Sequence, residues 1–535
     1  MATGKYVSDR VKKLFTCTHY INYASNAQDV ASLFAPRRSN IQTKKPEGDV
    51  AGWYDHILEP APIEAAQTLA QGQYDLLFTG NWFETVEPFM DTEGNKKSAN
   101  PVSKAYAKVG IIMRDVIEAS NFKLEIQEFL LDRSTTHTAV ILQEEDDEEV
   151  VFFRNLEPGT FAIAENYKKE VDTLARKIPL TARQIKQQFA LKTDSLPAKV
   201  QEALEKDKLD EMFEVEHLIE PREGGTQESK DPKKLPWACY YSMENHMIRE
   251  SGYYEQPFQS SRYNRWGDSP YGTGPAHVEL PRARLLQKMR QALIALGDRI
   301  TNPGIFVSEN QEGEVNPFGV TVVAREDAAA GLPREWQTNA RYDVTVDMID
   351  REINQLNDTF MIPLFKLLMN DTEREKTAYE VQKMLEEQIG RASPTFARLD
   401  KEVVVKLLMR LFNICLRKGK FDEIKDKLAV EGGIAQPAIN FTSKLAQAMK
   451  AVRSNTVIQF LNSLGFLIEN KPEILINTDW NKTYRRMWIE SGNPVDELGD
   501  EKQVKVQQEA MMQAAIAQQA AETGKTAAEA IKAGR

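Results

Sequence analysis

The stretch from Asp343 to Leu368, DVTVDMIDREINQLNDTFMIPLFKLL, carries the clearest helical pattern of the chain. Its apolar residues recur every three or four positions, the period of an α-helix: Val346, Ile349, Ile353, Leu356, Phe360, Leu364 and Leu367. We expect one helix over 343–362, about 30 Å long because each residue adds about 1.5 Å of rise. Pro363 should kink it, since proline removes a backbone donor and clashes with the preceding turn.

Another amphipathic helix is predicted before this one. Its apolar residues lie mostly three to four positions apart: Leu285, Leu286, Met289, Leu293, Leu296 and Ile300. Turn formers crowd Gly267–Pro275 in front of it, which predicts a rigid turn, and Asn302-Pro303-Gly304 should end it. Between the two helices, residues 301–342 hold Gly and Pro turns and two strand-like runs, Ile305–Val307 and Val320–Val323.

Residues 1–137 are predicted to be mainly helical, and strands follow them. The apolar runs Thr138–Leu142 and Val150–Phe153 flank the acidic run 144–149. A hairpin with its tip in solvent is the simplest interpretation of this order. A metal site is the alternative, although contiguous acids lack the spacing of a calcium loop.

Short elements continue through the next hundred residues. The pattern predicts a helix from Pro179 to Phe189, a loop over 221–236, and strands at Glu214–Ile219, Tyr240–Ser242 and Met247–Ile248.

The C-terminal part is predicted to be helical again. Thr377-Ala378-Tyr379-Glu380 has the Ser/Thr-x-x-Glu form of a capped helix start, and we expect this helix to reach Arg417 with a break near Ser393-Pro394. Short helices are predicted within 442–498. The Ala- and Gln-rich tail 501–535 should be helical only where it packs against neighbours.

Composition excludes several classes of protein. A net charge of −11 argues against a protein whose whole surface grips phosphate. The three cysteines, Cys17, Cys239 and Cys415, share no metal spacing and are predicted to be reduced thiols. The polar N-terminus lacks the apolar core of a signal peptide, and no run approaches the ~18 apolar residues of a membrane span.

Two stretches resemble enzyme motifs, but neither has all the residues that its motif requires. Thr523-Gly524-Lys525-Thr526 resembles the end of a phosphate-binding loop, but the first glycine of that motif is replaced by Gln519. Gly272-Thr273-Gly274 begins like a dinucleotide fingerprint, but His277 occupies its third glycine position. The six histidines form no metal-binding pair or Cys/His cluster. We therefore expect no catalytic residue, no cofactor and no metal.

Several short motifs, in order along the chain, resemble those of phage portal proteins, the head-to-tail connectors of short-tailed, T7-like podoviruses. They are Asn81-Trp82-Phe83, Ser120-Asn121-Phe122, Pro270-Tyr271-Gly272-Thr273-Gly274-Pro275 followed by Leu280-Pro281-Arg282, Thr377-Ala378-Tyr379-Glu380-Val381, and Asp479-Trp480 through Asn493-Pro494. Tyr379 departs from the family's pattern, which has Thr there. The order helix, turn-rich insert, kinked helix, charged loop and capped helix is also similar to the family's.

This resemblance implies a mainly α fold with an α+β wing and a small α/β clip, the portal fold, in a dodecameric ring. The implied regions are the wing (1–278 and 377–440), stem helix 1 (279–300), the clip (301–342), stem helix 2 (343–369), the tunnel loop (370–376), the crown (441–500) and a helical tail (501–535).

The implied function is a ring-shaped channel through which viral DNA is packaged into the procapsid and later ejected. The implied partners are further copies of the chain, double-stranded DNA, the terminase large subunit, scaffolding protein, major capsid protein, and tail adaptor or nozzle proteins, with no membrane. The implied location is the head–tail junction of the virion, with host cytoplasm during assembly. Two other classes stay open, another structural tail or virion component and a DNA-processing enzyme.

Three sets of candidate functional residues follow from the resemblance and the helical pattern. Acidic residues step by four, three and then eight positions along the second long helix, about 100° round from its apolar stripe: Asp343, Asp347, Asp350 and Asp358. They face either outer solvent or the channel, where carboxylates would repel phosphate. The tunnel loop contributes Asp371, Glu373, Arg374, Glu375 and Lys376, for which a solvated helix connection is the alternative. Phe318 and Trp336 are candidate docking residues of the clip, for which a plain surface hairpin is the alternative.

Overall fold

The computed structural model describes residues 3–43, 50–86, 101–189, 196–301, 305–306, 334–335, 342–368, 378–430, 433–444 and 446. The chain divides into two compact units, the first made of Met1–Tyr74 and Val116–Ile414, the second of Asp75–Asp115 and Cys415–Arg535. Both mix helices with small antiparallel sheets. None of the helices within these ranges has both the length and the apolar character needed to cross a bilayer.

An antiparallel five-stranded sheet organises the first unit. Its strands follow one another in chain order: β4 (Phe161–Glu165), β5 (Val171–Thr181), β6 (Met212–Pro221), β7 (Trp237–Met243) and β8 (His246–Tyr253). Successive side chains point to opposite faces of a strand, so Tyr240 and Tyr241 of β7 belong to different clusters.

Helices cover both faces of this sheet. Helix α1 (Gly4–Thr16) places Val7, Val11 and Leu14 on one face. The helices α7 (Ala182–Phe189) and α8 (Ala198–Glu205) cover the other, with Ile185, Phe189 and Val200 fully or almost fully buried.

A three-stranded sheet, in the order β3-β2-β9, lies next in the core of the first unit. It consists of β2 (Thr138–Asp146), β3 (Val150–Leu156) and β9 (Phe258–Arg262). Asp146 pairs with Val150 across the β2–β3 hairpin, and residues 147–149 are exposed, which confirms the predicted hairpin with an acidic tip. One apolar cluster joins both sheets to helix α2 (Thr18–Phe34), where Tyr23 stacks on Tyr271 at 4.3 Å between ring centroids.

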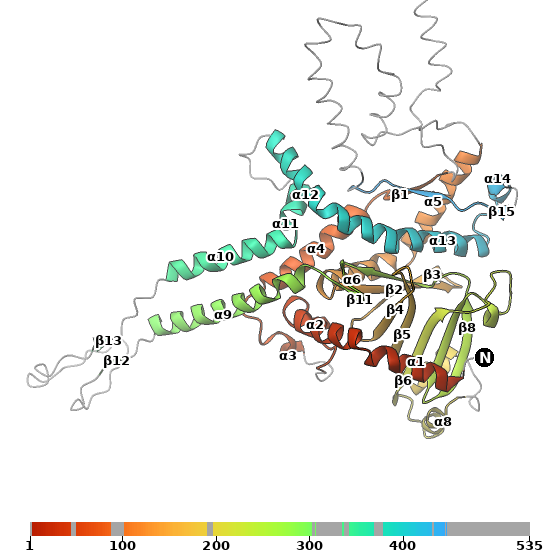
Figure 1. The fold of residues 1–535 in the computed structure, drawn as a ribbon, viewed down its shortest axis with the longest axis horizontal. Coiled ribbons are helices and arrows are strands. Elements are labelled where there is room, and N and C mark those ends of the chain that lie inside the picture. Colours follow the sequence, from red (N-terminus) through yellow and green to blue (C-terminus); the bar gives the residue numbers. More distant parts are fainter. Residues whose placement is uncertain are drawn as a thin grey trace, which may run out of the picture. The chain divides into compact units, whose positions relative to one another are not determined.

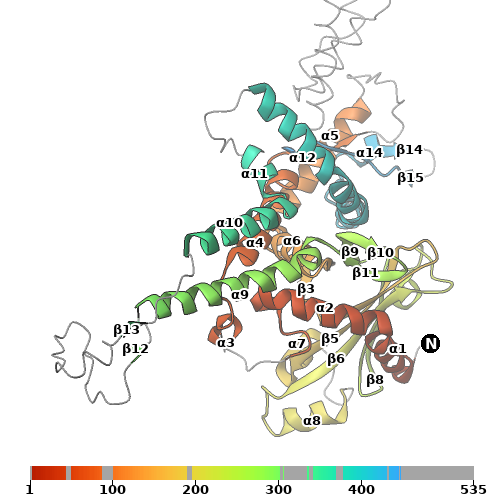
Figure 2. The ribbon, with the colours of Figure 1, turned by 60° about the vertical axis from the view of Figure 1, so that its left-hand side comes forward.

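Two long helices, α9 (Pro275–Thr301) and α10 (Tyr342–Thr359), lie side by side and run away from the sheets (Figure 1, Figure 2). Helix α10 is followed by α11 (Ile362–Leu368) and then α12 (Ala378–Leu399). A π-helical turn, Asp400–Val404, leads from α12 into α13 (Val405–Arg417). The remaining elements of the first unit are a 3-10 turn at Pro36–Arg38, α3 (Val50–Tyr54), α4 (Ala61–Leu77, which extends past Tyr74), α6 (Phe122–Thr135), a 3-10 turn at Pro232–Lys234, β10 (Asn264–Trp266), β11 (Ser269–Thr273), β12 (Ile305–Phe306) and β13 (Arg334–Glu335).

The second unit is smaller, and its described part has two two-stranded sheets, β1–β16 and β14–β15. Its elements are β1 (Phe83–Val86), most of α5 (Pro101–Ala119), α14 (Lys425–Leu428), β14 (Ala429–Val430), β15 (Gly433–Ile434) and β16 (Ala438–Phe441). Strand β1 pairs antiparallel with β16, although the two lie more than 350 residues apart in the sequence. The Tyr106 hydroxyl donates to the Ala435 carbonyl oxygen at 3.1 Å, which ties α5 to the segment before β16.

The structure corrects two predictions about turns and helix starts. The expected helix from Pro179 begins at Ala182 instead, because Pro179–Thr181 pairs with β6 as the end of β5. The expected rigid turn Gly267–Pro275 is largely strand, since β11 pairs with β10. Only Gly267 and Asp268, the first two residues of the stretch, form a turn. Gly267 has φ +51°, the left-handed conformation that such a tight turn requires.

Two predicted helix irregularities are also displaced. Helix α10 does not kink at Pro363 but ends at Thr359, and Met361 has φ +57° before α11 begins. Pro363 therefore lies in the first turn of α11, where its missing N–H is not needed. The predicted break near Ser393-Pro394 is wrong, because α12 continues through Pro394 and the irregularity is the π turn six residues later. Most of 301–342, the loop 370–376 and nearly everything after 442 lie outside the described residues.

Candidate functional site

The helix pair α9–α10 carries the described part of the predicted functional residues. Ile349 and Leu356 of α10, and Phe360 directly after it, are at most 1% exposed. On α9, the buried side chains include Ala283, Leu286 and Leu293, with spacings of three and seven that keep them on one helical face. Each helix therefore has one apolar stripe that packs inside the first unit and an outer surface that does not.

A polar network joins the two helices near their junction with the sheets. Arg282 donates from Nε to Glu352 Oε2 at 2.7 Å and from Nη2 to Gln355 Oε1 at 2.8 Å, and it also pairs with Glu279. The Thr359 hydroxyl donates to Glu279 Oε1 at 2.7 Å. Burial alone would lower the pKa of Arg282, but its hydrogen bonds to the two glutamates outweigh that and raise it. The network fixes one α9 register against α10.

Two further polar contacts hold α9 to the rest of the first unit. The side chain of Gln287 accepts from the backbone N–H of Leu58 at 2.7 Å and donates to the Glu59 carbonyl oxygen at 2.8 Å. Arg290 pairs with the Glu59 carboxylate, which is buried. These contacts fix the middle of α9 to the segment that precedes α4.

The acidic stripe lies on the outer surface of α10. Asp343, Asp347, Asp350 and Asp358 are all exposed, and so is Asn354 between them. They lie on the side of α10 away from the buried Ile349 and Leu356. The stripe is a row of solvent-facing carboxylates in the isolated chain.

The same helices also expose large apolar side chains, of which only Leu285 and Ile300 belong to the apolar pattern noted in the sequence. On α9 these are Val278, Leu285, Ile294 and Ile300, and on α10 Val344 and Met348, all between 42% and 69% exposed. Leu285 and Ile300, which share the helical period of the buried Leu286 and Leu293, are thus exposed in the single chain. Helix α9 contacts α10, α2 and α6, and among its apolar side chains Ala283, Leu286 and Leu293 are buried.

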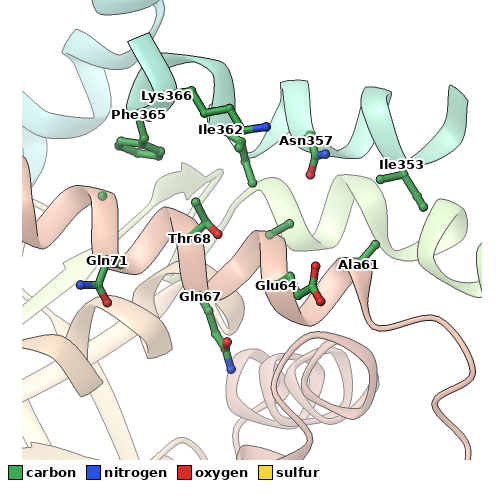
Figure 3. A pocket seen from close by; sticks show the side chains of 12 residues that line it. Ala61, Glu64, Gln67, Thr68, Gln71, Ile353, Asn357, Ile362, Phe365 and Lys366 are labelled. Atoms are coloured by element: carbon green, nitrogen blue, oxygen red, sulfur yellow. The ribbon is translucent and has the colours of Figure 1, made fainter. Parts of the chain in front are cut away.

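A cavity of about 430 Å³ lies between α4 and the α10–α11 turn (Figure 3). In Figure 3, Glu64 and Thr68 of α4 lie opposite Asn357 and Lys366. Its lining has one carboxylate and one ammonium group but no His, Cys or Ser. The cavity thus lacks the imidazole, thiol and serine hydroxyl groups of the commonest hydrolytic sites, and Thr68 is the one hydroxyl in its lining.

Among the described residues, a histidine–cysteine pair buried in the five-stranded sheet most resembles a base and its nucleophile. His217 Nε2 lies 3.2 Å from Cys239 Sγ, and Arg176 Nε donates to His217 Nδ1 at 2.7 Å. Burial raises the pKa of the Cys239 thiol to about 12, so the thiolate is not formed at neutral pH. Across the described ranges, no three His, Cys, Asp or Glu side chains are grouped so as to hold a metal ion.

A buried arginine is a second feature that the sequence did not reveal. Arg133 donates to Ser261 Oγ at 3.1 Å, to Gln73 Oε1 at 3.1 Å and to the Thr395 carbonyl oxygen at 3.0 Å. It is completely buried, and burial lowers its pKa to about 10. It connects four elements that are far apart in the sequence, a structural role that no local pattern signals.

The other candidate residues lie outside the described part of the chain. These are the tunnel-loop residues Asp371, Glu373, Arg374, Glu375 and Lys376, and the clip residues Phe318 and Trp336.

Comparison with known proteins identifies the family. The family model described as "Bacteriophage head to tail connecting protein" matches residues 9–517. The chain is 27% identical over 500 residues to the "Probable portal protein" of Bordetella phage BPP-1, covering 88% of this chain and 86% of that protein. It is 25% identical over 523 residues to the "Portal protein" of Salmonella phage epsilon15, covering 96% and 92%. The chain therefore belongs to the bacteriophage head-to-tail connecting protein family, as a structural connector of the phage virion and not as an enzyme.

Proposed function

We propose that this connector is a closed, dodecameric ring at the head–tail junction, through which the phage genome is packaged and later ejected. The observation that carries the proposal is the outer surface of α9 and α10, where six large apolar side chains stay exposed on two well-anchored helices. Exposed apolar side chains gathered on neighbouring elements mark interaction sites more often than chance. Copies of one chain can cover them by head-to-tail contacts that close into a ring.

The acidic stripe of α10 would then form part of the channel wall. Binding of DNA through counterion release needs Lys and Arg against phosphates, and Asp343, Asp347, Asp350 and Asp358 supply the opposite charge. DNA would move past such a wall without being held. The net charge of −11 agrees with a channel that does not grip its cargo.

The resemblance to portals supplies the finer parts of the proposal. The regions keep the boundaries given above, and the phage would be of the short-tailed, T7-like type. The clip, with Phe318 and Trp336, would dock the terminase large subunit during packaging and the tail adaptor or nozzle proteins afterwards. The wing would contact scaffolding protein and major capsid protein. The tunnel loop 370–376 would be a mobile constriction whose Arg374 and Lys376 help to retain DNA.

The test of the channel is charge reversal on the stripe, Asp347→Lys with Asp350→Lys. We expect the rings to form normally, because both side chains are exposed, and DNA packaging to slow and become more sensitive to salt. Lys12→Glu with Lys13→Glu, at exposed positions of α1 outside the stripe, is the control for reversing two surface charges. Unchanged packaging and salt dependence in the double variant would mean that the stripe does not face DNA.

A further inference from the structure

A cavity of about 710 Å³ lies in the first unit, where the π turn meets the sheets. One wall comes from the α12–π–α13 segment, with Arg398, Lys401, Glu402 and Lys406. The opposite wall comes from the β4–β5 turn and from β9 and β10. Its polar members are Lys168, Glu170, Gln256, Gln259, Ser260, Arg262 and Arg265. None of the acidic-stripe residues belongs to it.

The lining of this cavity is strongly basic. It has six Lys and Arg side chains against two Glu, an excess of four positive charges on a chain whose net charge is −11. Only Arg262 is neutralised by direct pairing, with Glu165 and Glu402. Positive charge is therefore concentrated here although the chain as a whole is acidic.

The other cations have no carboxylate partner. Within the described part of the chain, no ion pair involves Lys168, Lys401 or Lys406. Arg265 donates to the Lys169 carbonyl oxygen at 3.2 Å, and Arg398 donates to the Tyr263 carbonyl oxygen at 3.1 Å. Neutral carbonyl acceptors leave both guanidinium charges available to an anion.

Buried polar atoms in the wall point to the same conclusion. Gln259, Ser260 and Arg262 are at most 8% exposed and line the cavity. Ser260 Oγ and Arg262 Nε have no hydrogen-bond partner among the described atoms, and neither does Gln259 Oε1. A buried donor without an acceptor costs free energy unless a ligand supplies one. Two of these three atoms are donors to an oxyanion.

The π turn explains how the helical wall gathers its lysines. Lys401 and Lys406 are five residues apart, and in a regular α-helix such residues point about 140° away from each other. The π turn Asp400–Val404 closes on an i→i+5 hydrogen bond, from the N–H of Val405 to the carbonyl oxygen of Asp400. Both lysines consequently line one cavity. Such turns occur frequently at functional sites.

We propose that this cavity is a binding site for a phosphate group. Phosphate offers several acceptor oxygens and up to two negative charges in a small volume, which matches guanidinium, ammonium and hydroxyl donors converging from two walls. The phosphate could belong to a small free phosphate or to the phosphodiester backbone of a nucleic acid, and the two share this chemistry. The site is separate from the stripe on α10 and does not depend on the proposed channel.

The experiment is calorimetric titration of the full-length protein with inorganic pyrophosphate, with a single-stranded oligonucleotide and with polyglutamate of equal charge. We expect the phosphate ligands to bind and polyglutamate to bind at least tenfold more weakly. Tighter binding of the oligonucleotide would assign the site to nucleic acid, and tighter binding of pyrophosphate to a free phosphate. Each of these two outcomes supports a phosphate site.

The matched variants are Lys401→Gln with Lys406→Gln in the cavity and Lys12→Gln with Lys13→Gln on exposed positions of α1. Both pairs remove two positive charges, so they change the net charge equally. We expect the cavity pair to bind phosphate at least tenfold more weakly than the wild type. The α1 pair should bind it as tightly as the wild type does. If the cavity pair fails to fold or assemble, as judged by melting and light scattering, Lys168→Gln with Arg265→Gln on the opposite wall replaces it. No binding by the wild type, equal binding by both variants, or equal binding of polyglutamate would overturn the proposal.

Discussion

The five-stranded sheet and the α9–α10 pair bury their apolar side chains to very different extents. The sheet is covered on both faces, by α1 on one side and by α7 and α8 on the other. The helix pair is covered on one side only and leaves Val278, Ile300 and Met348 more than half exposed. The sheet region therefore has a complete core within one chain, whereas the helix pair has apolar surface that the described residues of the chain leave exposed.

Phe161→Ala tests the packing of the sheet region. Phe161 is completely buried in the cluster that joins both sheets. We expect the free energy of unfolding to fall by about 3–5 kcal/mol, because the substitution leaves a cavity that the core cannot fill. Chemical denaturation measures the change. Tyr167→Ala, at an 88% exposed aromatic in the same part of the chain, should cost less than about 0.5 kcal/mol. Equal effects would mean that the sheet region is not a packed core.

Arg282→Ala addresses the junction between the two regions. It removes the ion pairs to Glu279 and Glu352 and leaves the buried Glu279 without a positive partner. We expect a loss of about 2 kcal/mol in unfolding free energy, the usual scale for a buried hydrogen bond to a charged group. Arg284→Ala, two residues away, breaks an ion pair to Asp29 that is 55% exposed on both sides. That control should cost only about 0.5 kcal/mol. A larger loss of unfolding free energy from Arg284→Ala than from Arg282→Ala would contradict the conclusion that the Arg282 network holds α9 to α10.

Acidification should weaken the sheet region through its buried histidines. Burial lowers the pKa of His217 well below its usual value near 6.5, with Arg176 adding to the effect. The unfolded chain then binds the proton more readily, so stability is fully present above pH 6.5 and falls below it. The slope is at most about 1.4 kcal/mol per pH unit for each such histidine.

His217→Gln isolates this contribution in melting curves recorded between pH 7.5 and 5.5. We expect a flatter pH dependence than in the wild type, whereas His19→Gln, at an exposed position, should leave the slope unchanged. Asp132 acts in the opposite direction, because burial raises its pKa to about 7 despite the nearby Arg38. Its contribution is common to all the variants and cancels in the comparison. An unaltered slope in His217→Gln would show that this histidine titrates normally in the fold.

Ile294→Asp with Met348→Asp should have little effect on the folding of the single chain. Both side chains are about half exposed, so we expect less than about 0.5 kcal/mol change in unfolding free energy of the separated subunit. Assembly should nevertheless be lost, because two carboxylates would be buried at the subunit contact. Lys288→Asp, exposed on the same helix, is the control at a position that is already charged. Normal assembly of the double variant would exclude this surface from the contact.

Local patterns in the sequence predicted the elements that depend on local physics. The helical period correctly predicted a helix that buries Ile349 and Leu356, and the acidic run 144–149 correctly predicted a hairpin tip. The position of the break before α11 depends instead on a distant partner. Phe360 stacks on Phe34 of α2, with ring centroids 5.5 Å apart, and the chain turns directly after it.

The residues missed by sequence reasoning share this dependence on distant partners. Arg133 bonds to residues 60, 128 and 262 positions away, and the basic cavity takes its two walls from segments more than 130 residues apart. Leu285 fits the helical period but faces solvent, because periodicity gives the faces of a helix and not which face a neighbour covers.

The most direct test of the account is the mass and shape of the purified full-length protein, measured by light scattering and by negative-stain imaging. If the apolar surface of α9 and α10 is covered by neighbouring copies, particles should be closed rings of well above six copies with an axial hole. The Ile294→Asp, Met348→Asp protein should then be a folded monomer under the same conditions. A wild-type protein that stays a stable monomer or dimer at micromolar concentration would contradict the account.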